Sequence, residues 1–342
     1  MSFLDFRRML PFCAPTWDWI QVEVTSFCNA ACIYCPRTVY KESWENRHLP
    51  LATFKKLAPV LPKTRHVHLQ GWGEPFLHPE LFELIAMAKA AGCRVGTTTN
   101  GMLLSPTIIA RIVDSGVDIL AFSLAGTDER NDKIRKGTRL DKVVEAMKAL
   151  KQEKQKKNTK NPKIHVAYML FRSGLPSLDR LPALLEDTGA EQVVISTLDF
   201  VPSHDLQHEN LTPKNTGEYE ETVSLLDRAA EEGRKRGLTL DFYLGSPEEK
   251  GIAVCTENVQ RALCVGSGGS VTPCVFTNSQ LSDSSCFIHN ENGPYEGMSF
   301  GNIKEQSIKE IWRKEEYVVF RRSFLTGNLA PPCRGCMKLR RR

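Results

Sequence analysis

The sequence predicts an α/β fold built on a parallel sheet, and three observations support this. Apolar, β-branched stretches alternate with amphipathic helical stretches from about residue 19 onward, an order typical of βα units with right-handed crossovers. Polar and glycine-rich motifs follow several predicted strands, where parallel α/β folds gather their functional residues. The chain has 342 residues, enough for two domains, and the regular alternation stops near residue 245.

Six strands and five intervening helices are predicted before residue 200. The strands are expected at 20–25, 65–70, 94–98, 118–124, 164–170 and 192–197, and the helices at 51–60, 79–91, 106–115, 140–154 and 177–187. Ser105 before Pro106 indicates a helix start, and Gly92 indicates a helix end. A longer helix over 213–236, opened by Thr212 and ended by Gly237, precedes a short strand over 238–243. Six such units are fewer than the eight of a complete barrel.

Composition divides the chain into three parts. We expect an N-terminal extension over 1–18, an α/β domain over 19–245 and a small cysteine-rich domain over 246–342. Glycine, serine and cysteine become dense in the last part, which places the predicted boundary near residue 245.

Charge and hydropathy favour a cytoplasmic protein without a membrane partner. The first ten residues lack the apolar core of a signal peptide, and no run of 18 apolar residues occurs. The net charge is +5, and its basic segments at 151–163 and 338–342 are expected to be solvated chain or helix ends. Nucleic acid is therefore not an expected partner. The eleven cysteines have short spacings, which predict metal sites rather than disulfides.

A loop with three cysteines follows the first predicted strand. Cys28, Cys32 and Cys35 have the spacing C-x3-C-x2-C, and thiolates are soft ligands that suit iron–sulfur clusters, zinc and Cu(I). Structural zinc usually takes four protein ligands. Three cysteines therefore either await a distant fourth ligand or leave one metal position open for a reacting group. A zinc loop or a set of buried thiols is the alternative interpretation.

Three further motifs end the next strands, so all four are expected on one face of the sheet. They are 71–75, which contains Gly73 and Glu74, 98–101, which contains Asn100, and 123–126, which begins with Ser123. A carboxylate such as that of Glu74 can accept hydrogen bonds from an ammonium group, and a glycine beside it lets a ligand approach the backbone.

The cysteine loop resembles that of the radical SAM superfamily, which also places an aromatic residue such as Tyr34 before the third cysteine. This resemblance implies a partial (β/α)6 TIM-like barrel. It implies a [4Fe-4S] cluster on Cys28, Cys32 and Cys35, one iron of which binds S-adenosylmethionine. The implied chemistry is reductive cleavage of that cofactor to a 5′-deoxyadenosyl radical, which abstracts a hydrogen atom from the substrate.

The same resemblance implies the remaining cofactor-binding residues. The stretch around Gly73 and Glu74 is similar to the family's G-G-E-P motif, which holds the cofactor's amino group, although Trp72 stands where the first glycine normally is. Arg135 is expected to pair with the cofactor's carboxylate because guanidinium and carboxylate groups match bidentately, and Lys136 is the alternative. The resemblance also implies contacts from four further places, namely Tyr34, Asn100, Ser123 and the backbone of 195–198.

The cysteine order of the last hundred residues resembles a SPASM or twitch domain. The resemblance implies one auxiliary [4Fe-4S] cluster, because the further late cysteines of a two-cluster SPASM domain are absent from this sequence. A four-cysteine zinc site is the alternative that spacing alone leaves open. Cys264 and Cys286 are second choices as ligands, whereas Cys13 and Cys93 are expected to be structural. The predicted ligands are Cys255, Cys274, Cys333 and Cys336.

The resemblance implies a radical enzyme whose substrate the sequence does not name. We expect modification of a peptide or protein, including maturation of a metalloenzyme, with a reductant such as flavodoxin or ferredoxin. Dehydrogenation of a small sugar or alcohol is one alternative. A non-catalytic two-cluster electron carrier and a zinc-stabilised nucleic-acid module are others, but a carrier needs no cofactor-holding set, and no basic stripe interleaved with aromatic residues supports the module.

Overall fold

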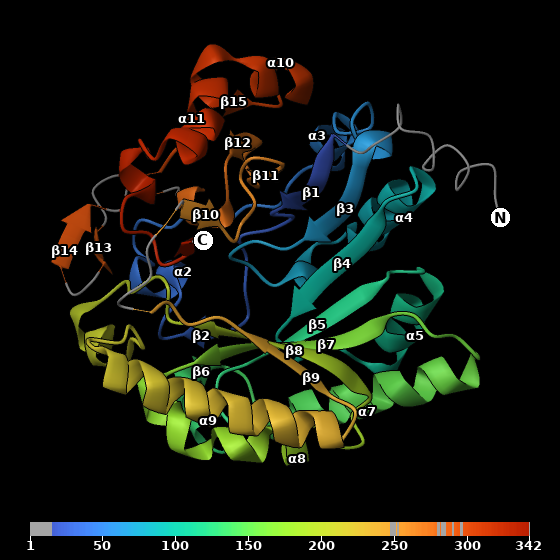
Figure 1. Cartoon of the computed structure of the whole chain (residues 1–342). Coiled ribbons are helices and arrows are strands. Elements are labelled where there is room, and N and C mark those ends of the chain that lie inside the picture. Colours follow the sequence, from blue (N-terminus) through green and yellow to red (C-terminus); the bar gives the residue numbers. More distant parts are fainter. Residues whose placement is uncertain are drawn as a thin grey trace.

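The chain forms one large, curved sheet with helices on its outer face, as a computed structural model shows (Figure 1). The structure describes residues 16–246, 251, 253–278, 281, 285–288, 291–294 and 297–341. The expectations for Cys13 and for the side chain of Cys286 fall outside the described parts.

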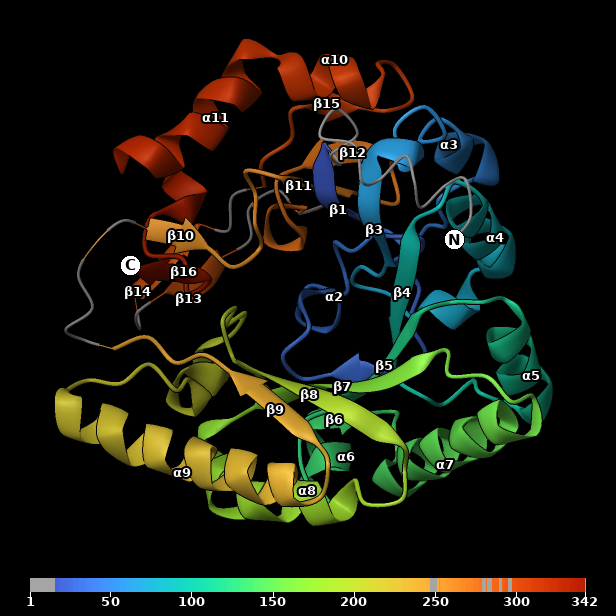
Figure 2. The same cartoon turned by 45° about the vertical axis from the view of Figure 1, so that its right-hand side comes forward.

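Seven parallel strands form the barrel part of the sheet (Figure 2). Their bounds agree with the predicted strands to within a few residues, and the predicted α/β fold with a partial parallel barrel is confirmed. In spatial order these strands are β1 (Trp17–Val22), β3 (Thr64–Leu69), β4 (Arg94–Thr99), β5 (Ile119–Leu124), β7 (Lys163–Leu170), β8 (Ala190–Thr197) and β9 (Thr239–Phe242).

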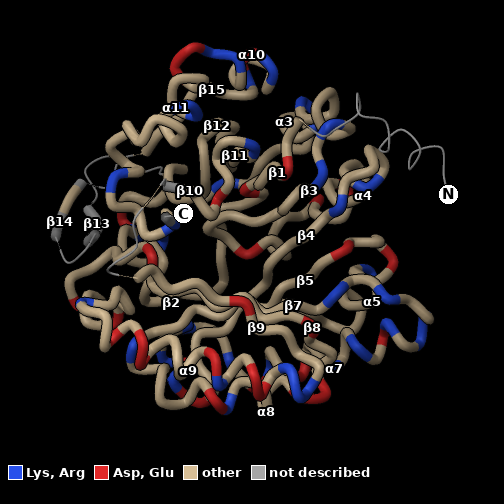
Figure 3. The backbone as a smooth tube through the Cα atoms, viewed as in Figure 1, with Lys and Arg blue, Asp and Glu red and all other residues tan. Residues whose placement is uncertain are grey.

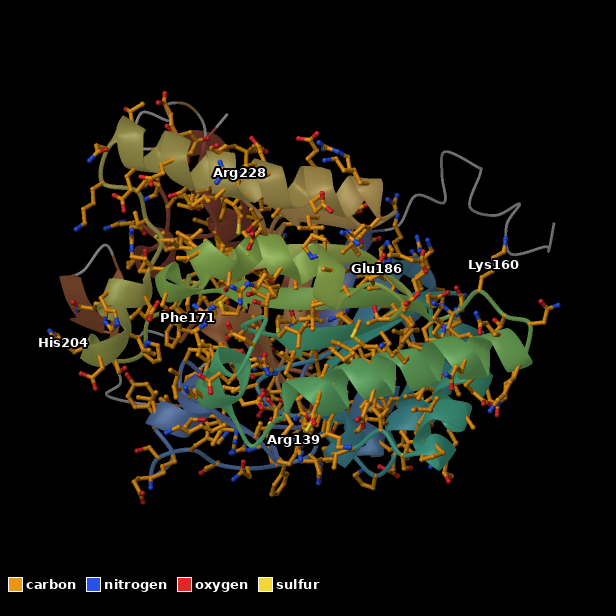
Figure 4. All side chains as sticks on the ribbon, turned by 90° about the horizontal axis from the view of Figure 1, so that it is seen from below. Arg139, Lys160, Phe171, Glu186, His204 and Arg228 are labelled. Atoms are coloured by element: carbon orange, nitrogen blue, oxygen red, sulfur yellow. The ribbon has the colours of Figure 1, made fainter. Side chains whose placement is uncertain are left out.

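Helices cover the outside of these strands, and the charged residues of α7 and α9 gather there (Figure 3). Figure 4 shows Arg228 of α9 pointing outward, whereas Phe171, which is buried, lies among the inner elements. No helix in the described part of the chain combines the length and the apolar character needed to cross a membrane. The helices are α3 (Leu51–Lys55), α4 (Leu81–Ala90), α5 (Pro106–Asp114), α7 (Leu140–Lys156), α8 (Leu181–Leu184) and α9 (Thr216–Lys235).

Three predicted helices have different bounds in the structure. The helix predicted over 51–60 ends as an α-helix at Lys55. The region 177–187 is mostly the 3-10 helix η4 (Arg172–Arg180) followed by one α-helical turn, because Pro176 and Pro182 each remove a backbone donor. The long helix starts at Asn215, whose side chain caps the backbone N–H of Glu218, rather than at Thr212.

The sheet continues past β1 into the C-terminal part of the chain. Strand β11 (Ala262–Val265) pairs in parallel with β1, on the edge opposite to β3, and forms a hairpin with β12 (Ser270–Thr272). Strand β15 (Gly301–Asn302) completes the sheet. The sheet and its apolar core therefore cross the predicted domain boundary, and the core includes Val22 of the barrel together with Val265 and Tyr317.

The remaining elements surround this hairpin. Two small antiparallel pairs lie beside it, β10 (Ala253–Cys255) with β16 (Leu339–Arg341) and β13 (Ser285–Ile288) with β14 (Glu291–Pro294). Two helices follow, α10 (Ile308–Arg313) and α11 (Glu315–Thr326). Short 3-10 helices are η2 (Leu61–Lys63), η3 (Pro75–Leu77), η5 (His204–Glu209), η6 (Val275–Thr277) and η7 (Pro331–Cys333).

Glu23 joins the barrel to the C-terminal hairpin. Its fully buried carboxylate accepts hydrogen bonds from the backbone N–H of Trp72 at 3.0 Å and of Ser267 at 3.0 Å. It also accepts from the Ser267 hydroxyl at 2.8 Å and from Asn278 Nδ2 at 3.2 Å. Gly71 leaves room for this carboxylate, because a Cβ there would lie 2.2 Å from Glu23 Cγ. Buried charge is tolerated here because its oxygens have several donors.

We predict that Glu23→Ala separates the hairpin from the barrel. The substitution leaves buried donors without an acceptor, and hydrogen bonds to charged groups contribute about 1.5–3 kcal/mol each, so the free energy of unfolding should fall by about 3 kcal/mol or more. Thermal unfolding of anaerobically prepared protein and proteolysis beyond residue 250 measure this. Glu129→Ala removes a carboxylate that is 79% exposed and should change little. Equal behaviour of the two variants would contradict the prediction.

Candidate functional site

The four strand-end motifs converge on one cavity of about 300 Å³. It lies at the carboxyl ends of the barrel strands, where parallel α/β folds place their chemistry. Every residue predicted for the first site lines this cavity, namely Cys28, Cys32, Tyr34, Cys35, Gly73, Glu74, Asn100, Ser123 and Arg135.

The cysteine loop is fastened to the segment that follows β5. Within the loop, β2 (Ala31–Cys32) pairs with β6 (Arg135–Lys136), which directly follows α6 (Arg130–Ile134), and Cys32 lies opposite Arg135. The backbone N–H of Ile33 donates to the carbonyl of Ile134 at 3.0 Å. Gly137 has φ of 89° and lies against this loop, since a Cβ there would be 3.0 Å from the Asn29 carbonyl oxygen. The pairing fixes Arg135 beside the cysteines.

Gly73 is also needed for backbone packing. A Cβ at Gly73 would lie 2.2 Å from the carbonyl oxygen of Thr25 and 2.5 Å from that of Phe27. The next residue, Glu74, donates its backbone N–H to the Phe27 carbonyl at 2.8 Å. The glycine therefore brings the motif after β3 against the start of the cysteine loop, and it lines the cavity at the same time.

Glu74 is a buried carboxylate held by its neighbours. It accepts hydrogen bonds from the Thr99 hydroxyl at 2.8 Å, the backbone N–H of Asn100 at 2.7 Å and that of Phe76 at 3.3 Å. Burial raises the pKa of Glu74 to about 7, although these hydrogen bonds and the charge of Arg135 lower it. Such a group can hold a cation in this cavity once it is ionised.

Arg135 and Tyr34 form a buried pair at the same cavity. The guanidinium of Arg135 donates to the Tyr34 hydroxyl, and the Tyr34 ring packs edge-on against Phe171 with centroids 5.7 Å apart. Burial raises the pKa of the Tyr34 hydroxyl, so it stays protonated at neutral pH. The Nε of Arg135 is buried without a hydrogen-bond partner among the described residues. This orphaned donor beside a cavity fits an anionic group such as a carboxylate.

Two thiols of the loop, those of Cys28 and Cys35, are poor thiolates as they stand. Burial raises the pKa of Cys35 to about 12 and also raises that of Cys28. The backbone N–H of Ala30 donates to the sulfur of Cys28 at 3.4 Å, and that of Arg37 donates to Cys35, which partly offsets the burial. Deprotonation at neutral pH therefore requires a metal centre to accept the thiolates. Donation to sulfur is one of the ways in which proteins tune iron–sulfur clusters.

The second cysteine set meets beside β10 and the C-terminal segment. Burial raises the pKa of Cys255 and of Cys333 to about 12 each, and it raises that of Cys274 and Cys336 as well. Cys274 and Cys336 contribute to the raised pKa of Cys333, and Cys255 and Cys336 contribute to that of Cys274. These mutual effects place the four thiols in one neighbourhood, supplied by both ends of the C-terminal part.

Backbone donors distinguish some of these cysteines from the others. The backbone N–H of Glu257 donates to Cys255 and that of Lys338 donates to Cys336, as happens at Cys28 and Cys35 in the first loop. Cys264 is instead fully buried within β11, and Cys93 is a buried thiol that donates to the Leu61 carbonyl at 3.1 Å. In the described ranges, no three cysteine, histidine or acidic side chains are grouped to hold a single metal ion. Cluster ligation therefore stays a prediction.

A second cavity of about 870 Å³ lies between β8, β9 and the segment 335–340. It shares Ser196, Asp199 and Lys338 with the first cavity. Lys338 and Asp199 form an ion pair at 2.6 Å whose side chains are 17% and 11% exposed. The carboxylate of Glu257 also lines the larger cavity, and it has no hydrogen bond or ion pair within the described part of the chain. Cys336 of the second cysteine set also lines the larger cavity, so the two cavities share part of their lining near this set.

Trp72 accounts for the departure from the G-G-E-P motif. Its ring packs against Phe200 and Phe276, with centroid distances of 6.3 Å and 6.1 Å. Its indole N–H donates to the Asn278 carbonyl at 3.4 Å. The side chain therefore bridges the barrel and the C-terminal part at the rim of the first cavity, which a glycine could not do.

Sequence reasoning missed five residues of these sites: Glu23, Arg37, Asp199, Glu257 and Lys338. A glutamate within an apolar strand and an arginine two residues after a cysteine are signals that could have identified the first two. His68 lies in β3, and its Nε2 hydrogen-bonds to Gln70 at 2.6 Å and to Thr98 at 3.2 Å, which satisfies this ring nitrogen within the barrel.

Comparisons with known proteins agree with this arrangement. Residues 22–171 match the family profile of the radical SAM superfamily, and residues 255–337 match that of the SPASM iron–sulfur cluster-binding domain. The tungsten-containing aldehyde ferredoxin oxidoreductase cofactor-modifying protein of Pyrococcus furiosus is 26% identical, over 93% of this chain and 86% of that protein. The PqqA peptide cyclase of Granulibacter bethesdensis is 22% identical, over 92% of this chain and 78% of that protein.

A solved structure shows the same fold. Streptococcus suis SuiB bound to the precursor peptide SuiA superposes with a TM-score of 0.64 at 14% identity, and the match covers 94% of this chain and 69% of that one.

We predict that iron content separates the ligand cysteines from the other thiols. Two [4Fe-4S] clusters correspond to about eight irons per chain. Replacing Cys28, Cys32 and Cys35 together by alanine should halve the iron, and so should replacing Cys255 and Cys274. Cys93→Ala and Cys264→Ala are matched controls that should keep it. Iron and sulfide analysis after anaerobic reconstitution measures this, and stoichiometric zinc with little iron would contradict the prediction.

The raised pKa of Glu74 predicts a pH-dependent affinity for S-adenosylmethionine. Only the ionised carboxylate pairs with the cofactor's ammonium, so the affinity should fall as the pH drops below about 7. Between pH 8 and pH 6 the loss should be about tenfold. Equilibrium dialysis of the reconstituted protein measures this. Glu74→Gln should bind more weakly and show no such dependence, whereas an unchanged pH profile in that variant would assign the ammonium to another group.

Proposed function

Since this chain belongs to the radical SAM superfamily and carries a SPASM iron–sulfur cluster-binding domain, we propose that it is a maturase acting on a peptide or protein. Its cofactors are S-adenosylmethionine, the [4Fe-4S] cluster that binds it, and an auxiliary iron–sulfur cluster in the C-terminal part. We assign the first cluster to Cys28, Cys32 and Cys35, and a single auxiliary cluster to Cys255, Cys274, Cys333 and Cys336.

When bound, these cofactors supply hydrogen-atom abstraction by a 5′-deoxyadenosyl radical. The chain's own residues bind S-adenosylmethionine and orient it. Glu74 holds its ammonium, and Arg135 holds its carboxylate through the Nε–H that has no other partner among the described residues. Ser123 and Asn100 line the same cavity. Burial of these groups excludes water from the cavity, which protects a reactive intermediate from side reactions.

The observation that favours a peptide is the larger cavity beside β9. The strand β9 ends the sheet order, and its outer edge has no strand partner among the described residues. The cavity is lined by residues of this strand, including Asp241 and Phe242, and it joins the cysteine-loop cavity through the lining that the two share. A free strand edge offers main-chain donors and acceptors to an extended peptide. In both cartoon views the β10–β16 pair lies on the other side of this opening (Figures 1 and 2).

One relative and one structural neighbour support a peptide as the class of substrate: the relative is named a peptide cyclase, and the neighbour was solved with a precursor peptide. A second relative is named a cofactor-modifying protein of a tungsten-containing oxidoreductase, which fits maturation of a metalloenzyme. We further propose a flavodoxin or ferredoxin as electron donor and the cytoplasm as the site of action. The intact cofactor-binding set at the strand ends argues against a simple electron carrier, which needs only cluster ligands.

We predict that peptides, rather than small metabolites, are changed in mass by the enzyme. A random octapeptide library and a mixture of sugars, alcohols and nucleotides are each incubated anaerobically with the reconstituted protein, S-adenosylmethionine and dithionite. Peptides should increase 5′-deoxyadenosine formation and yield mass-shifted products, because an extended chain can pair with β9. The triple cysteine-to-alanine variant is the control. Products only from the small-molecule mixture would favour the dehydrogenase alternative.

A further inference from the structure

Arg37 is a second guanidinium at the cysteine cavity, and no predicted role includes it. It lies in the short helix α2 (Pro36–Val39), two residues after Cys35, and lines the cavity together with all three cysteines of the loop. Its guanidinium donates to the carbonyl of Ala30, which lies between Cys28 and Cys32. The side chain therefore reaches back across the loop that carries it.

The charge of Arg37 has no counter-charge in the described part of the chain. Among the described residues no carboxylate lies within ion-pair distance of Arg37, and its Nε is buried without a hydrogen-bond partner. Other arginines differ in this respect, because Arg130 pairs with Asp128 at 2.7 Å and Arg172 pairs with Glu218. A partly buried guanidinium with an unused donor is costly unless an anion comes close to it.

The negative charge closest at hand is that of the cysteines. Arg37 lines one cavity with Cys28, Cys32 and Cys35, and its guanidinium contacts the loop backbone between the first two of them. Arg135 lines the same cavity but already donates to Tyr34, and it lies opposite Cys32 in the β2–β6 pair. Of the two arginines, only Arg37 is carried by the cysteine loop and its short helix.

We propose that Arg37 is a positioning residue for the loop's iron–sulfur cluster, which it makes easier to reduce by offsetting the negative charge of the cysteine thiolates. This inference rests on the proposed assignment of Cys28, Cys32 and Cys35 as cluster ligands. A fixed positive charge close to a redox centre stabilises the reduced state, which carries one more negative charge, over the oxidised state. The contact with Ala30 holds that charge at a constant place on the loop.

Anaerobic redox titration followed by EPR tests the proposal on the full-length, reconstituted protein. The signal that changes on addition of S-adenosylmethionine reports the loop cluster and separates it from the auxiliary cluster. In Arg37→Gln, the ratio of reduced to oxidised loop cluster at the parent's midpoint potential should fall about tenfold, which is 59 mV for one electron. Arg37→Lys keeps the positive charge, so in this variant the same ratio should fall less than threefold. Arg139→Gln removes an arginine that is 65% exposed and should leave the ratio unchanged.

Iron content and cofactor affinity are measured on the same samples. Arg37→Gln with the parent's iron content and the parent's ratio would overturn the proposal. A lower affinity for S-adenosylmethionine at an unchanged ratio would also overturn it, because Arg37 would then bind the cofactor's carboxylate. If Arg37→Gln loses iron, the test passes to Arg37→Lys. A parent-like ratio of reduced to oxidised loop cluster in Arg37→Lys supports the proposal, and a tenfold fall of that ratio overturns it. Absence of iron from the parent's loop would instead contradict the proposed function itself.

Discussion

The buried carboxylate of Glu23 is the interaction on which the arrangement of both sites depends. It stands at the end of β1, immediately before the cysteine loop, and accepts donors from the motif after β3, from the β11–β12 turn and from Asn278. Since β1 pairs in parallel with β3 on one side and β11 on the other, this single group sets the barrel, the cysteine loop and the C-terminal hairpin relative to one another. An apolar residue in place of Glu23 would leave these buried donors without an acceptor.

Electrostatics at the two cysteine sets follow one pattern. Burial raises the pKa of these thiols. At Cys28, Cys35, Cys255 and Cys336, a hydrogen bond from the backbone N–H two residues further along the chain partly offsets this rise. The loop cavity adds side-chain guanidinium groups, whereas the C-terminal set faces the ion pair of Lys338 and Asp199 together with Glu257. The two sets are therefore built alike in backbone but differ in surrounding charge, and differing charge is a means of giving two clusters different potentials.

Much of the barrel and of the first site could be predicted from sequence. The spacing of apolar residues indicates the strands and helices, and the position of the motifs after the strands indicates the site. Apolar strands alternating with helices give a parallel sheet, and the ends of parallel strands meet on one face, so motifs separated by whole βα units came together as expected. The pairing of β11 with β1 could not be predicted, since nothing local in a short apolar strand states its partner. Asn215 replaced Thr212 as the helix cap because both are good caps, and tertiary packing chose between them. Asp199 and Lys338 were missed because their pairing joins residues far apart in the chain.

Trp72 shows why a departure from a motif is best understood through the part of the molecule that it contacts. In the barrel alone, a large indole in place of a small glycine has no evident purpose. In the whole chain, its ring packs between Phe200, after β8, and Phe276, in the C-terminal part. Its backbone N–H donates a hydrogen bond to the Glu23 carboxylate. Aromatic pairs of this kind bury large areas and prefer edge-on contacts, so the indole closes a seam that the C-terminal part creates. The residues next to it, Gly73 and Glu74, keep the backbone geometry that the cysteine loop requires. The indole therefore shapes the rim of the cavity beside Gly73 and Glu74, which line the cavity with it.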